Sequence, residues 1–520
     1  MKISLPRRLL VLSLGLTVLT SAALAADTPP AVYDVRAYGA TGDGKTIDSG
    51  AVNRAIDAAA AAGGGTVRFP AGTYVSYTIH LKSNVALYLD AGSTIQAAPQ
   101  PTGGEPGYDL AEPNLFQGKD NVYQDYGHSH FHNSLILGEN VENVSILGPG
   151  RIYGHALFRD GGTRPGEGNK AIALKLCRNV TLKDFTLFEA GWFSLLATGV
   201  DNLTLDNLHV DTNRDGFDID CCRNVRVSNC TVNSPRDDGI CLKSSFGLGF
   251  ARATENVTIT NCSVSGYDMG TFLDGTYKVT RGMGGTGRIK FGTESNGGFK
   301  NITISNCIFD HCSGLAIESV DGGIIEDVTV SNLAMRSIAN APIFIRLGHR
   351  MRGPADTPIG TIRRVSISNI VASNVSSGSA ILIAGTTDHP IEEVRLSDIR
   401  IIYQGGGTAA QAAINPPQDE RQFYPEPGSL GVMPAYGMFA RHINGLTLRD
   451  VEVSFTKDDV RPAVVLDDVA GIAFDHFKAQ RTAGVPVVVG TNVRDYTVQS
   501  SPGLAEGHLD TLGAAAAAVK

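Results

Sequence analysis

The sequence predicts an all-β fold, a solenoid of the parallel β-helix type in which short strands stack coil upon coil. Two observations carry this prediction. Glycine supplies 60 of 520 residues while only 18% are charged, a balance typical of many turns joining many short strands. A turn residue followed by alternating apolar and polar residues also recurs, with clear steps of 23 and 22 residues between Asn179, Asn202 and Asn224. That period suits about three short strands per coil.

Overall composition excludes several other classes of protein. Apolar residues make up 42% of the chain, too many for a disordered protein, and glycine has no strict period, which excludes collagen. Acidic residues outnumber basic ones by 52 to 44, so the net charge of -8 argues against a nucleic-acid partner. Length alone would suggest about three domains, but a repeat fold accommodates residues 26–505 as one β-helix domain.

The first 25 residues have the pattern of a cleavable signal peptide. Basic residues within the first eight positions precede an apolar run over 9–19, and Ala23-Leu24-Ala25 supplies small residues for cleavage. The alternative is a membrane anchor, but the apolar run is too short to span a bilayer. We therefore expect export to a periplasm or to the medium, with no membrane partner.

Each copy of the repeat is expected to form a strand with one buried face. The copies begin at Asn143, Asn179, Asn202, Asn224, Asn256 and Asn301, and further on at Asp327, Arg364, Glu393 and Gly445. One unit cannot bury its apolar face alone, whereas stacked units can. Cys230, Cys262 and Cys307 each follow asparagine at the same place, so we expect them to form an internal stack. The spacing of the eight cysteines indicates neither a disulfide scaffold nor a zinc site.

The two ends of the solenoid are expected to differ from its coils. Residues Asp48–Ala62 are rich in alanine and predict a helix that caps the first coil, with Asp48 as its N-cap. The run Gly63-Gly64-Gly65 should end that helix. The Ala-rich tail, residues 506–520, is expected to be a short helix or to be frayed.

Acidic residues gather on two neighbouring coils. Segment 213–220 carries Asp215, Asp218 and Asp220, and segment 236–243 carries Asp237 and Asp238. Asp215 and Asp237 are 22 residues apart, one repeat step, so we expect them on adjacent rungs about 4.8 Å apart. Because clustered carboxylates repel one another, the cluster indicates catalysis or a bound cation. The alternative interpretation is a stack of Asp-rich turns that only bond the backbone.

Strand alternation predicts which neighbours share this face. The side chains expected to point inward are Ile219, Ile240, Leu242, Ile289 and Phe291, and those expected to point outward are Asp218, Asp220, Lys243, Arg288 and Lys290. The segment Arg288-Ile289-Lys290 then lies beside the acidic cluster. It predicts either an ion-pair ladder or a site for the carboxylate of an acidic sugar, which arginine can bind in bidentate fashion.

Several motifs resemble those of glycoside hydrolase family 28, the polygalacturonase and rhamnogalacturonase family. The likeness extends from about Tyr33 to Val453. Residues 213–218 (Asn-Arg-Asp-Gly-Phe-Asp) resemble the family's Asn-Thr-Asp-Gly-Ile-Asp, and residues 237–244 (Asp-Asp-Gly-Ile-Cys-Leu-Lys-Ser) resemble its Asp-Asp-Cys-Ile-Ala-Ile-Lys-Ser. Residues 33–40 and 65–74 are also similar to bacterial members of the family.

This resemblance implies a right-handed parallel β-helix and inverting hydrolysis of α-glycosidic bonds in pectin. Asp237 would protonate the leaving oxygen, while Asp215 and Asp238 would activate water. Carboxyl groups of inverting enzymes are about 6.5–9.5 Å apart, which leaves room for that water. Asn213, Asp218 and Lys243 are expected to bind substrate, together with Arg288 and Lys290.

The sequence departs from the family pattern at two places. The family's histidine in Gly-His-Gly corresponds to Gly287, and its Arg-Ile-Lys corresponds to Ala316-Ile317-Glu318. An Arg-Ile-Lys occurs one coil earlier, at 288–290. Either the cationic subsite has moved by one rung, or the leaving sugar is not a simple galacturonate. Glu318 is then a candidate for binding sugar hydroxyls or for catalysis.

Two insertions, residues 99–133 and 404–436, are expected to wall a pocket and so to favour exo action. The first carries His128 and His130, which could bind metal or substrate, and we select His130 as a substrate-binding candidate. The second carries Tyr424, which could stack on a sugar, as could Trp192.

Three functional classes remain open from the sequence. The first is an exported glycosidase, acting as a monomer on acidic oligosaccharides or polysaccharides without a metal or other cofactor. The second is a polysaccharide lyase that holds Ca²⁺ with its aspartates and uses Arg288 or Lys290 as base. The third is a non-catalytic carbohydrate-binding solenoid.

Overall fold

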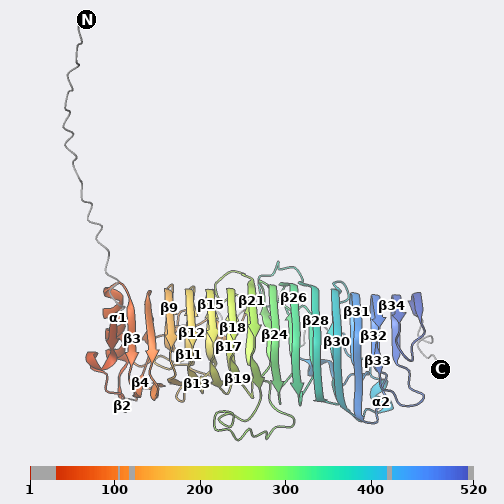
Figure 1. Ribbon diagram of the computed structural model, residues 1–520, viewed down its shortest axis with the longest axis horizontal. Coiled ribbons are helices and arrows are strands. Elements are labelled where there is room, and N and C mark those ends of the chain that lie inside the picture. Colours follow the sequence, from red (N-terminus) through yellow and green to blue (C-terminus); the bar gives the residue numbers. More distant parts are fainter. Residues whose placement is uncertain (2–30, 103–105, 116–122, 419–423, 513–520) are drawn as a thin grey trace.

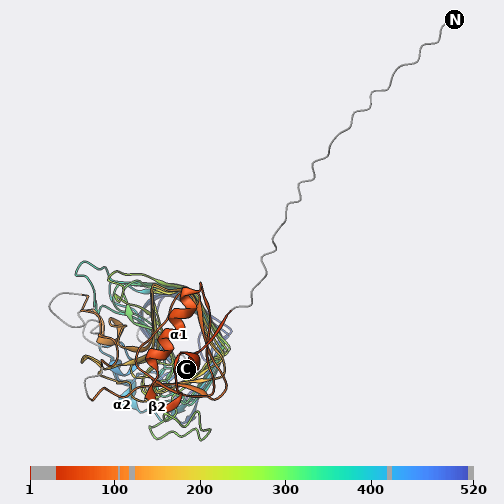
Figure 2. The ribbon, with the colours of Figure 1, turned by 90° about the vertical axis from the view of Figure 1, so that its left-hand side faces the viewer.

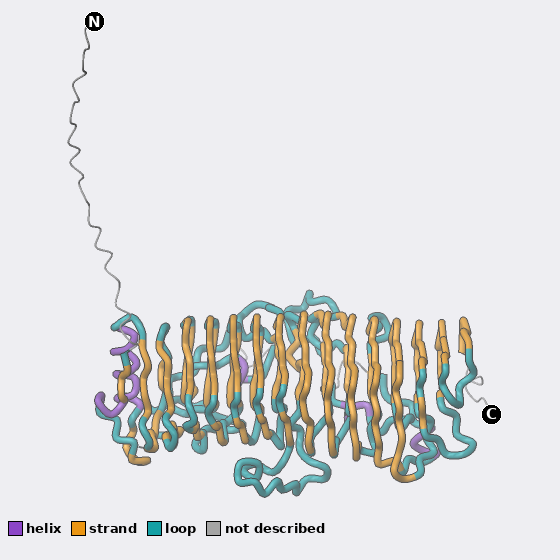
Figure 3. Tube along the Cα trace, in the orientation of Figure 1, coloured by secondary structure: helices purple, strands orange, loops and turns teal. Residues whose placement is uncertain are grey.

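A computed structural model describes Met1 and residues 31–102, 106–115, 123–418 and 424–512. The strands stack along one long axis into a single elongated solenoid, seen from the side in Figure 1 and as strands and loops in Figure 3. Neighbouring strands pair in parallel, except at the C-terminal end. The predicted parallel β-helix is confirmed.

Three stacks of strands run along the solenoid. The first, called the site sheet here, contains β5 (Ile79–His80), β8 (Ser134–Glu139), β11 (Lys170–Lys175), β14 (Phe193–Thr198), β17 (Asp215–Asp220), β20 (Ile240–Ser244), β23 (Ile289–Ser295), β25 (Leu315–Ser319), β27 (Ile343–Leu347), β29 (Ile381–Ala384) and β31 (Met438–Lys457). The second contains β1 (Val32–Asp34), β3 (Gly65–Phe69), β6 (Val85–Leu89), β9 (Glu142–Leu147), β12 (Arg178–Lys183), β15 (Asp201–Asp206), β18 (Arg223–Ser228) and β21 (Thr254–Thr260). The third contains β2 (Asp43–Ile47), β4 (Gly72–Ser76), β7 (Ser93–Ala97), β10 (Arg151–Tyr153), β13 (Thr186–Phe188), β16 (His209–Asp211), β19 (Thr231–Asn233) and β22 (Ser263–Ser265).

Beyond residue 298 the second and third stacks merge into long strands. Strand β24 (Phe299–Asp310) pairs with both β21 and β22, and so bridges the two stacks. The later strands are β26 (Ile324–Arg336), β28 (Thr361–Val375), β30 (Ile391–Gly405), β32 (Val464–Asp475), β33 (Lys478–Ala479), β34 (Val488–Gln499) and β35 (Gly507–Leu512).

The asparagine at the start of each repeat has a conformational reason. Asn179, Asn202 and Asn224 have φ of 55°, 58° and 57°, in the left-handed region that asparagine tolerates better than most residues. Their side chains also form a ladder across the coils, since Asn202 donates to Asn179 at 2.8 Å and Asn224 donates to Asn202 at 3.2 Å. The repeat therefore selects a residue that can both turn the chain and bond to the coil beside it.

The interior of the solenoid is apolar along its whole length. Ile219, Ile240 and Leu242 are fully buried in the main core, as strand alternation predicted. Cys230, Cys262 and Cys307 lie in the same core. Contact with Cys230, followed by burial, raises the pKa of the Cys262 thiol to about 12, although Cys307 acts in the opposite direction. All eight cysteines are buried free thiols.

Helix α1 (Ser49–Ala61) lies across the N-terminal end of the solenoid (Figure 2) and buries Val52, Ala55 and Ile56 there. Asp48 is the N-cap residue, as predicted, but its side chain makes no cap bond to the helix. Its carboxylate instead accepts hydrogen bonds from the backbone N–H groups of Thr41, at 2.7 Å, and Gly42, at 3.0 Å. Asp48 thus ties the preceding turn to the cap.

The C-terminal end differs from expectation. Strand β35 (Gly507–Leu512) pairs antiparallel with β34, so the sheet continues beyond residue 505 and this part of the tail is not helical. The signal-peptide prediction and the rest of the tail lie outside the described residues. Among the residues that are described, no helix is long and apolar enough to span a bilayer.

Short helices occur in the loops. They are α2 (Ala409–Ala412), η1 (Val35–Tyr38), η2 (Tyr126–His128) and η3 (Pro427–Leu430). Both η2 and η3 belong to the insertions predicted to wall a pocket, residues 99–133 and 404–436.

Candidate active site

Three consecutive rungs of the site sheet bring the predicted polar residues together. Strand β17 pairs with β20 and β20 with β23, with Phe217 opposite Ile240 and Ile240 opposite Ile289. Asp215, Asp238 and Arg288 therefore lie at or just before the starts of adjacent strands, along one edge of the sheet. The outward-facing side chains of β17 and β20 are covered by loops rather than open to water.

Asp215, Asp237 and Asp238 form a close carboxyl trio. One oxygen of each lies within 4.8 Å of an oxygen of the other two. These nearest oxygens are closer together than the about 6.5–9.5 Å expected between the carboxyl groups of an inverting enzyme. Asp215 and Asp237 lie on adjacent rungs, and Asp238 joins them there. The backbone N–H of Asp238, 23 residues on, donates to Asp215 Oδ1 at 3.2 Å.

The members of the trio differ in exposure. Asp215 is 3% exposed, as is Asp238, whereas the side chain of Asp237 is 32% exposed. Arg214 Nε lies 3.5 Å from Asp237 Oδ2, and the Arg214 guanidinium covers the ring of Trp192 at 4.3 Å. Trp192 is therefore packed beneath an arginine, while Asp237 is the member of the trio that a substrate can reach.

Burial and crowding raise the pKa of two carboxyls of the trio, those of Asp215 and Asp237. Burial, followed by repulsion from Asp237 and Asp218, raises the pKa of Asp215 well above its usual value. Burial, followed by repulsion from Asp238, also raises the pKa of Asp237, while Arg214 acts in the opposite direction. The trio can therefore hold a proton where an ordinary aspartic acid would have lost it.

Arg288 and Lys290 point outward beside the trio, as predicted, but they are 1% and 2% exposed. Arg288 Nε donates to Asp238 Oδ1 at 2.8 Å, and Lys290 Nζ lies 3.6 Å from Asp238 Oδ2. Both cations also contact Glu426 from the loop that follows β30, Lys290 at 3.4 Å. Arg288 and Lys290 thus form the ion-pair ladder that was one of the two predicted alternatives, with Asp238 and Glu426 as their partners.

Glu318 lies on β25, one rung beyond Lys290. Its carboxylate is fully buried, 3.6 Å from Lys290 Nζ, and neither oxygen has a hydrogen-bond partner among the described residues. Burial raises the pKa of Glu318 to about 8, although Lys290 opposes this. Glu318 therefore lies behind the cations, where a sugar hydroxyl does not reach it.

Asp218 and Lys243 belong to a second buried network. His128 Nε2 lies 2.9 Å from Asp218 Oδ2, Lys243 Nζ lies 4.0 Å from the same oxygen, and Lys243 donates to Glu294 at 3.0 Å. Burial opposes the charge of Lys243, but Asp218 and Glu294 raise its pKa well above its usual value. Asp220 instead accepts hydrogen bonds from the hydroxyl of Thr198 at 3.0 Å and from the hydroxyl and backbone N–H of Ser245, both at 2.7 Å. Its backbone bond is the kind that the alternative interpretation of the Asp-rich turns expects.

The remaining predicted residues divide between the site and its surroundings. Tyr424 lies at the site, since Thr293 donates to its hydroxyl at 2.7 Å and Lys290 lies over its ring at 5.3 Å. Asn213 is adjacent, and its carbonyl oxygen accepts from Arg159 at 3.0 Å.

His130 is buried elsewhere, stacked on Tyr126, and lines a separate cavity of about 520 Å³. The histidine that reaches the site is therefore His128 and not His130.

Sequence reasoning also missed Glu294 and Glu426 as site residues. Strand β23 has two more residues than β20 between Phe291 and Ser295, opposite Leu242 and Ser244, and this irregularity places Glu294 beside Lys243. Glu426 is 138 residues from Arg288 in the chain. The available signals were the Gly-Thr-Glu-Ser segment at 292–295 and the length of the second insertion.

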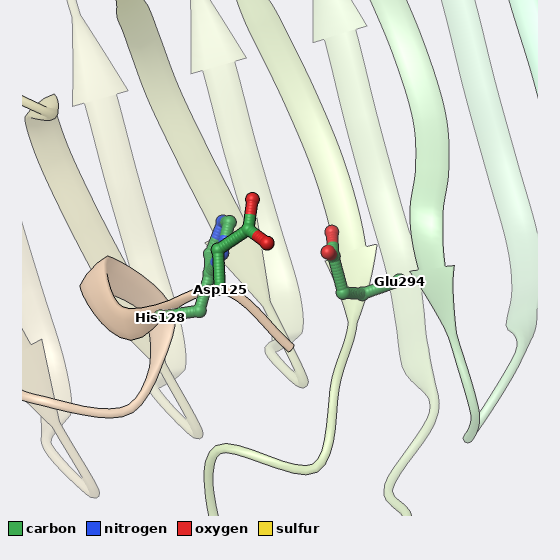
Figure 4. A group of neighbouring side chains, drawn as sticks. All are labelled: Asp125, His128 and Glu294. Carbon is green, nitrogen blue, oxygen red and sulfur yellow. The ribbon is translucent and has the colours of Figure 1, made fainter. Parts of the chain in front are cut away.

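Within the part of the chain that the structure describes, three groups of side chains could offer ligands to a metal ion: Asp125, His128 and Glu294; His128, Asp215 and Asp218; and Asp215, Asp237 and Asp238. Figure 4 shows the first group, in which Asp125 and His128 from one loop face Glu294 on another strand. Protein cations already contact these carboxylates, with Lys243 on Glu294, Arg352 on Asp125 and Arg288 on Asp238. This pairing disfavours the calcium site that a lyase would need.

Comparison with known proteins agrees with this arrangement. The family model described as glycosyl hydrolases family 28 matches residues 111–420, more than half of the chain. The chain belongs to glycoside hydrolase family 28. The family includes polygalacturonases, and this family 28 protein is a polygalacturonase-like glycosidase. A second model, rhamnogalacturonase A/epimerase, pectate lyase-like, matches residues 32–148.

Individual relatives of this family 28 glycosidase are distant. A polygalacturonase of Prunus persica is 25% identical over 421 residues, which cover 76% of this chain and 93% of the relative. An exo-poly-α-D-galacturonosidase of Dickeya chrysanthemi is 23% identical over 405 residues, covering 66% of this chain and 63% of the relative. The crystal structure of an exopolygalacturonase from Thermotoga maritima superposes with a TM-score of 0.57 at 19% identity, covering 72% of this chain and 88% of that one. This last likeness supports the fold.

Proposed function

We propose that this glycosidase hydrolyses α-glycosidic bonds of pectic or related acidic oligosaccharides and polysaccharides, with inversion at the anomeric carbon. The carboxyl trio carries the proposal. Asp237 is a partly exposed acid with a raised pKa, and two buried carboxyl groups, those of Asp215 and Asp238, lie beside it. Glycoside hydrolysis requires an acid and a second carboxyl group, and the trio supplies both, with its nearest oxygens closer together than the about 6.5–9.5 Å usual for inverting enzymes.

In the proposed reaction Asp237 donates its proton to the glycosidic oxygen as the bond from that oxygen to the anomeric carbon breaks. A water molecule attacks the anomeric carbon and passes a proton to the carboxyl pair of Asp215 and Asp238. Exposure supports Asp237 as the acid, because its side chain is 32% exposed whereas Asp215, whose pKa is also raised, is buried. The raised pKa of Asp237 lets it keep a proton at a higher pH than an isolated aspartate. Arg214 contacts Asp237 and so orients its carboxyl.

We also propose that the enzyme is exo-acting. The two insertions reach the site from different rungs, with His128 on Asp218 of β17 and Tyr424 on Thr293 of β23. Walls at both places favour a pocket that accepts a chain end. Relatives named for exo action support this proposal. We further propose export, on the basis of the first 25 residues, which is consistent with a polymeric substrate outside the cell, and a monomeric enzyme.

The test is a screen of pectic fragments and nitrophenyl glycosides with the wild type and Asp237→Asn, in which proton NMR follows the first anomer released. Inverted product from the wild type, absent from the variant, supports the proposal. Retained product would contradict inversion. An unsaturated product that absorbs ultraviolet light and disappears on chelation would replace the hydrolase by the lyase alternative. Binding without any turnover would indicate the non-catalytic solenoid.

A further inference from the structure

The cation pair next to the trio is already neutralised by carboxylates of the protein. Arg288 and Lys290 both contact Asp238, and both contact Glu426. Burial opposes ionisation of Glu426, but Arg288 and Lys290 lower its pKa to about 2. With Glu318 protonated below its pKa of about 8, two positive charges face two negative ones. No positive charge of this pair remains for another carboxylate.

Glu426 also covers the cations. The side chains of Arg288 and Lys290 are 1% and 2% exposed, whereas that of Glu426 is 35% exposed. The surface that a sugar meets beside the trio is therefore formed by two carboxyl groups, those of Asp237 and Glu426, and not by the guanidinium and ammonium groups beneath them. A sugar carboxylate placed there would meet negative charge and would have to displace Glu426 to reach either cation.

The position of Glu426 is fixed by its own loop. Tyr424 is anchored by the hydrogen bond from Thr293, and the Glu426 N–H donates to the Tyr424 carbonyl at 2.7 Å. Glu426 then begins η3, where its carbonyl accepts from the Ser429 hydroxyl at 2.7 Å. Backbone hydrogen bonds to residues before and after Glu426 therefore fix the position of its main chain. The placement of its carboxylate beside the cations does not depend on the ion pairs alone.

We propose that Glu426 takes the place of a substrate carboxylate and makes the enzyme select a neutral sugar on the side of the scissile bond that faces β23 and β25. The substrate class is then an acidic oligosaccharide or polysaccharide in which uronate alternates with neutral sugars. This inference rests on the proposed glycosidase activity and names the specificity of the same site. Glu426 acts through charge, so removing that charge alone should relax the selection.

The experiment compares oligomers made only of galacturonate with oligomers that alternate galacturonate and a neutral sugar. The wild type is expected to have a kcat/KM at least about tenfold higher on the alternating oligomers. Glu426→Gln, which keeps shape and removes charge, should reduce that ratio about tenfold or more by gaining activity on the uronate oligomers. Glu393→Gln, an exposed glutamate on β30 away from the site, is the matched control and should leave the ratio unchanged.

A binding measurement separates specificity from folding. In the Asp237→Asn background, calorimetry should detect tighter binding of galacturonate oligomers after Glu426→Gln. The variant is expected to melt at a lower temperature, because Arg288 and Lys290 lose a partner, so binding is measured well below that temperature, where both proteins are folded. Equal wild-type activity on the two oligomer classes, or a ratio that Glu426→Gln does not alter, would overturn the role of Glu426 while leaving the glycosidase intact. A wild type that cleaves neither class would overturn the proposed function and this inference together.

Discussion

The Nε2 atom of His128 lies 2.9 Å from Oδ2 of Asp218, and this contact joins the first insertion to a strand 90 residues further along the chain. Both side chains are almost completely buried, so the loop closes over the strand at this point. The same Asp218 oxygen lies 4.0 Å from Lys243, which in turn pairs with Glu294. The first insertion is therefore attached to the polar network beside the trio.

Replacing His128 by alanine should weaken the attachment of the first insertion to β17. Asp218 would lose its closest partner while remaining buried, which should cost about 1.5–3 kcal/mol in the free energy of unfolding. Because the loop lines the site, kcat/KM should also fall about tenfold. Denaturant unfolding and steady-state kinetics measure the two effects. His155→Ala, whose side chain is 65% exposed, serves as control. Unchanged kinetics in His128→Ala would show that this loop does not shape the site.

Asp237→Asn should abolish proton donation to the leaving oxygen. We expect kcat to fall by about 10²–10⁴, the range for loss of a general acid, with an unchanged melting temperature. Asp510→Asn, at an almost fully exposed position on β35, should behave as wild type. Full activity of Asp237→Asn would refute the assignment of the acid.

Arg214→Gln should move the pH profile in a defined direction. Asp237 must be protonated to act, so activity is present below its pKa and is lost as the pH rises through that value. Arg214 lowers the pKa of Asp237, against burial and Asp238. Removing its charge should therefore shift the alkaline limb of kcat/KM to higher pH. Arg214→Lys should keep the limb close to its original position, and a shift to lower pH in Arg214→Gln would contradict the geometry.

Glu318 should make stability depend on pH. Burial raises its folded-state pKa to about 8 from 4.5, so the folded protein binds a proton that the unfolded chain releases between these values. Stability is therefore lost as the pH rises from about 4.5 to 8. Glu318→Gln cannot ionise, so its melting temperature relative to wild type should increase across that range. A pH-independent difference would mean that Glu318 is already ionised in the fold.

The asparagine ladder predicts a graded response at Asn202. Its φ of 58° and its hydrogen bonds to Asn179 and Asn224 should make Asn202→Ala unfavourable by about 1–2 kcal/mol. Asn202→Gly should cost less, because glycine adopts this conformation without a Cβ penalty. Denaturant melts compare the two variants. Equal losses would assign the effect to the hydrogen bonds and not to the backbone conformation.

The sequence by itself determined the features that depend on local pattern. Alternation within each repeat identified the strands and placed Ile219 inside and Asp218 outside, because the side-chain period of a strand is two wherever the strand lies. The Ala-rich run ended by glycines predicted α1, and the Asp-rich motifs identified the rungs that carry the trio.

Only the tertiary structure decided which groups meet across those rungs. The register placed Asp238 as well as Asp237 beside Asp215, and the extra residues of β23 brought Glu294 to Lys243. The two insertions contributed His128 and Glu426. The physical reason is that the alternation of a strand is a local property of the sequence. The residue that a loop contacts depends instead on packing against residues 90 to 138 positions away in the chain.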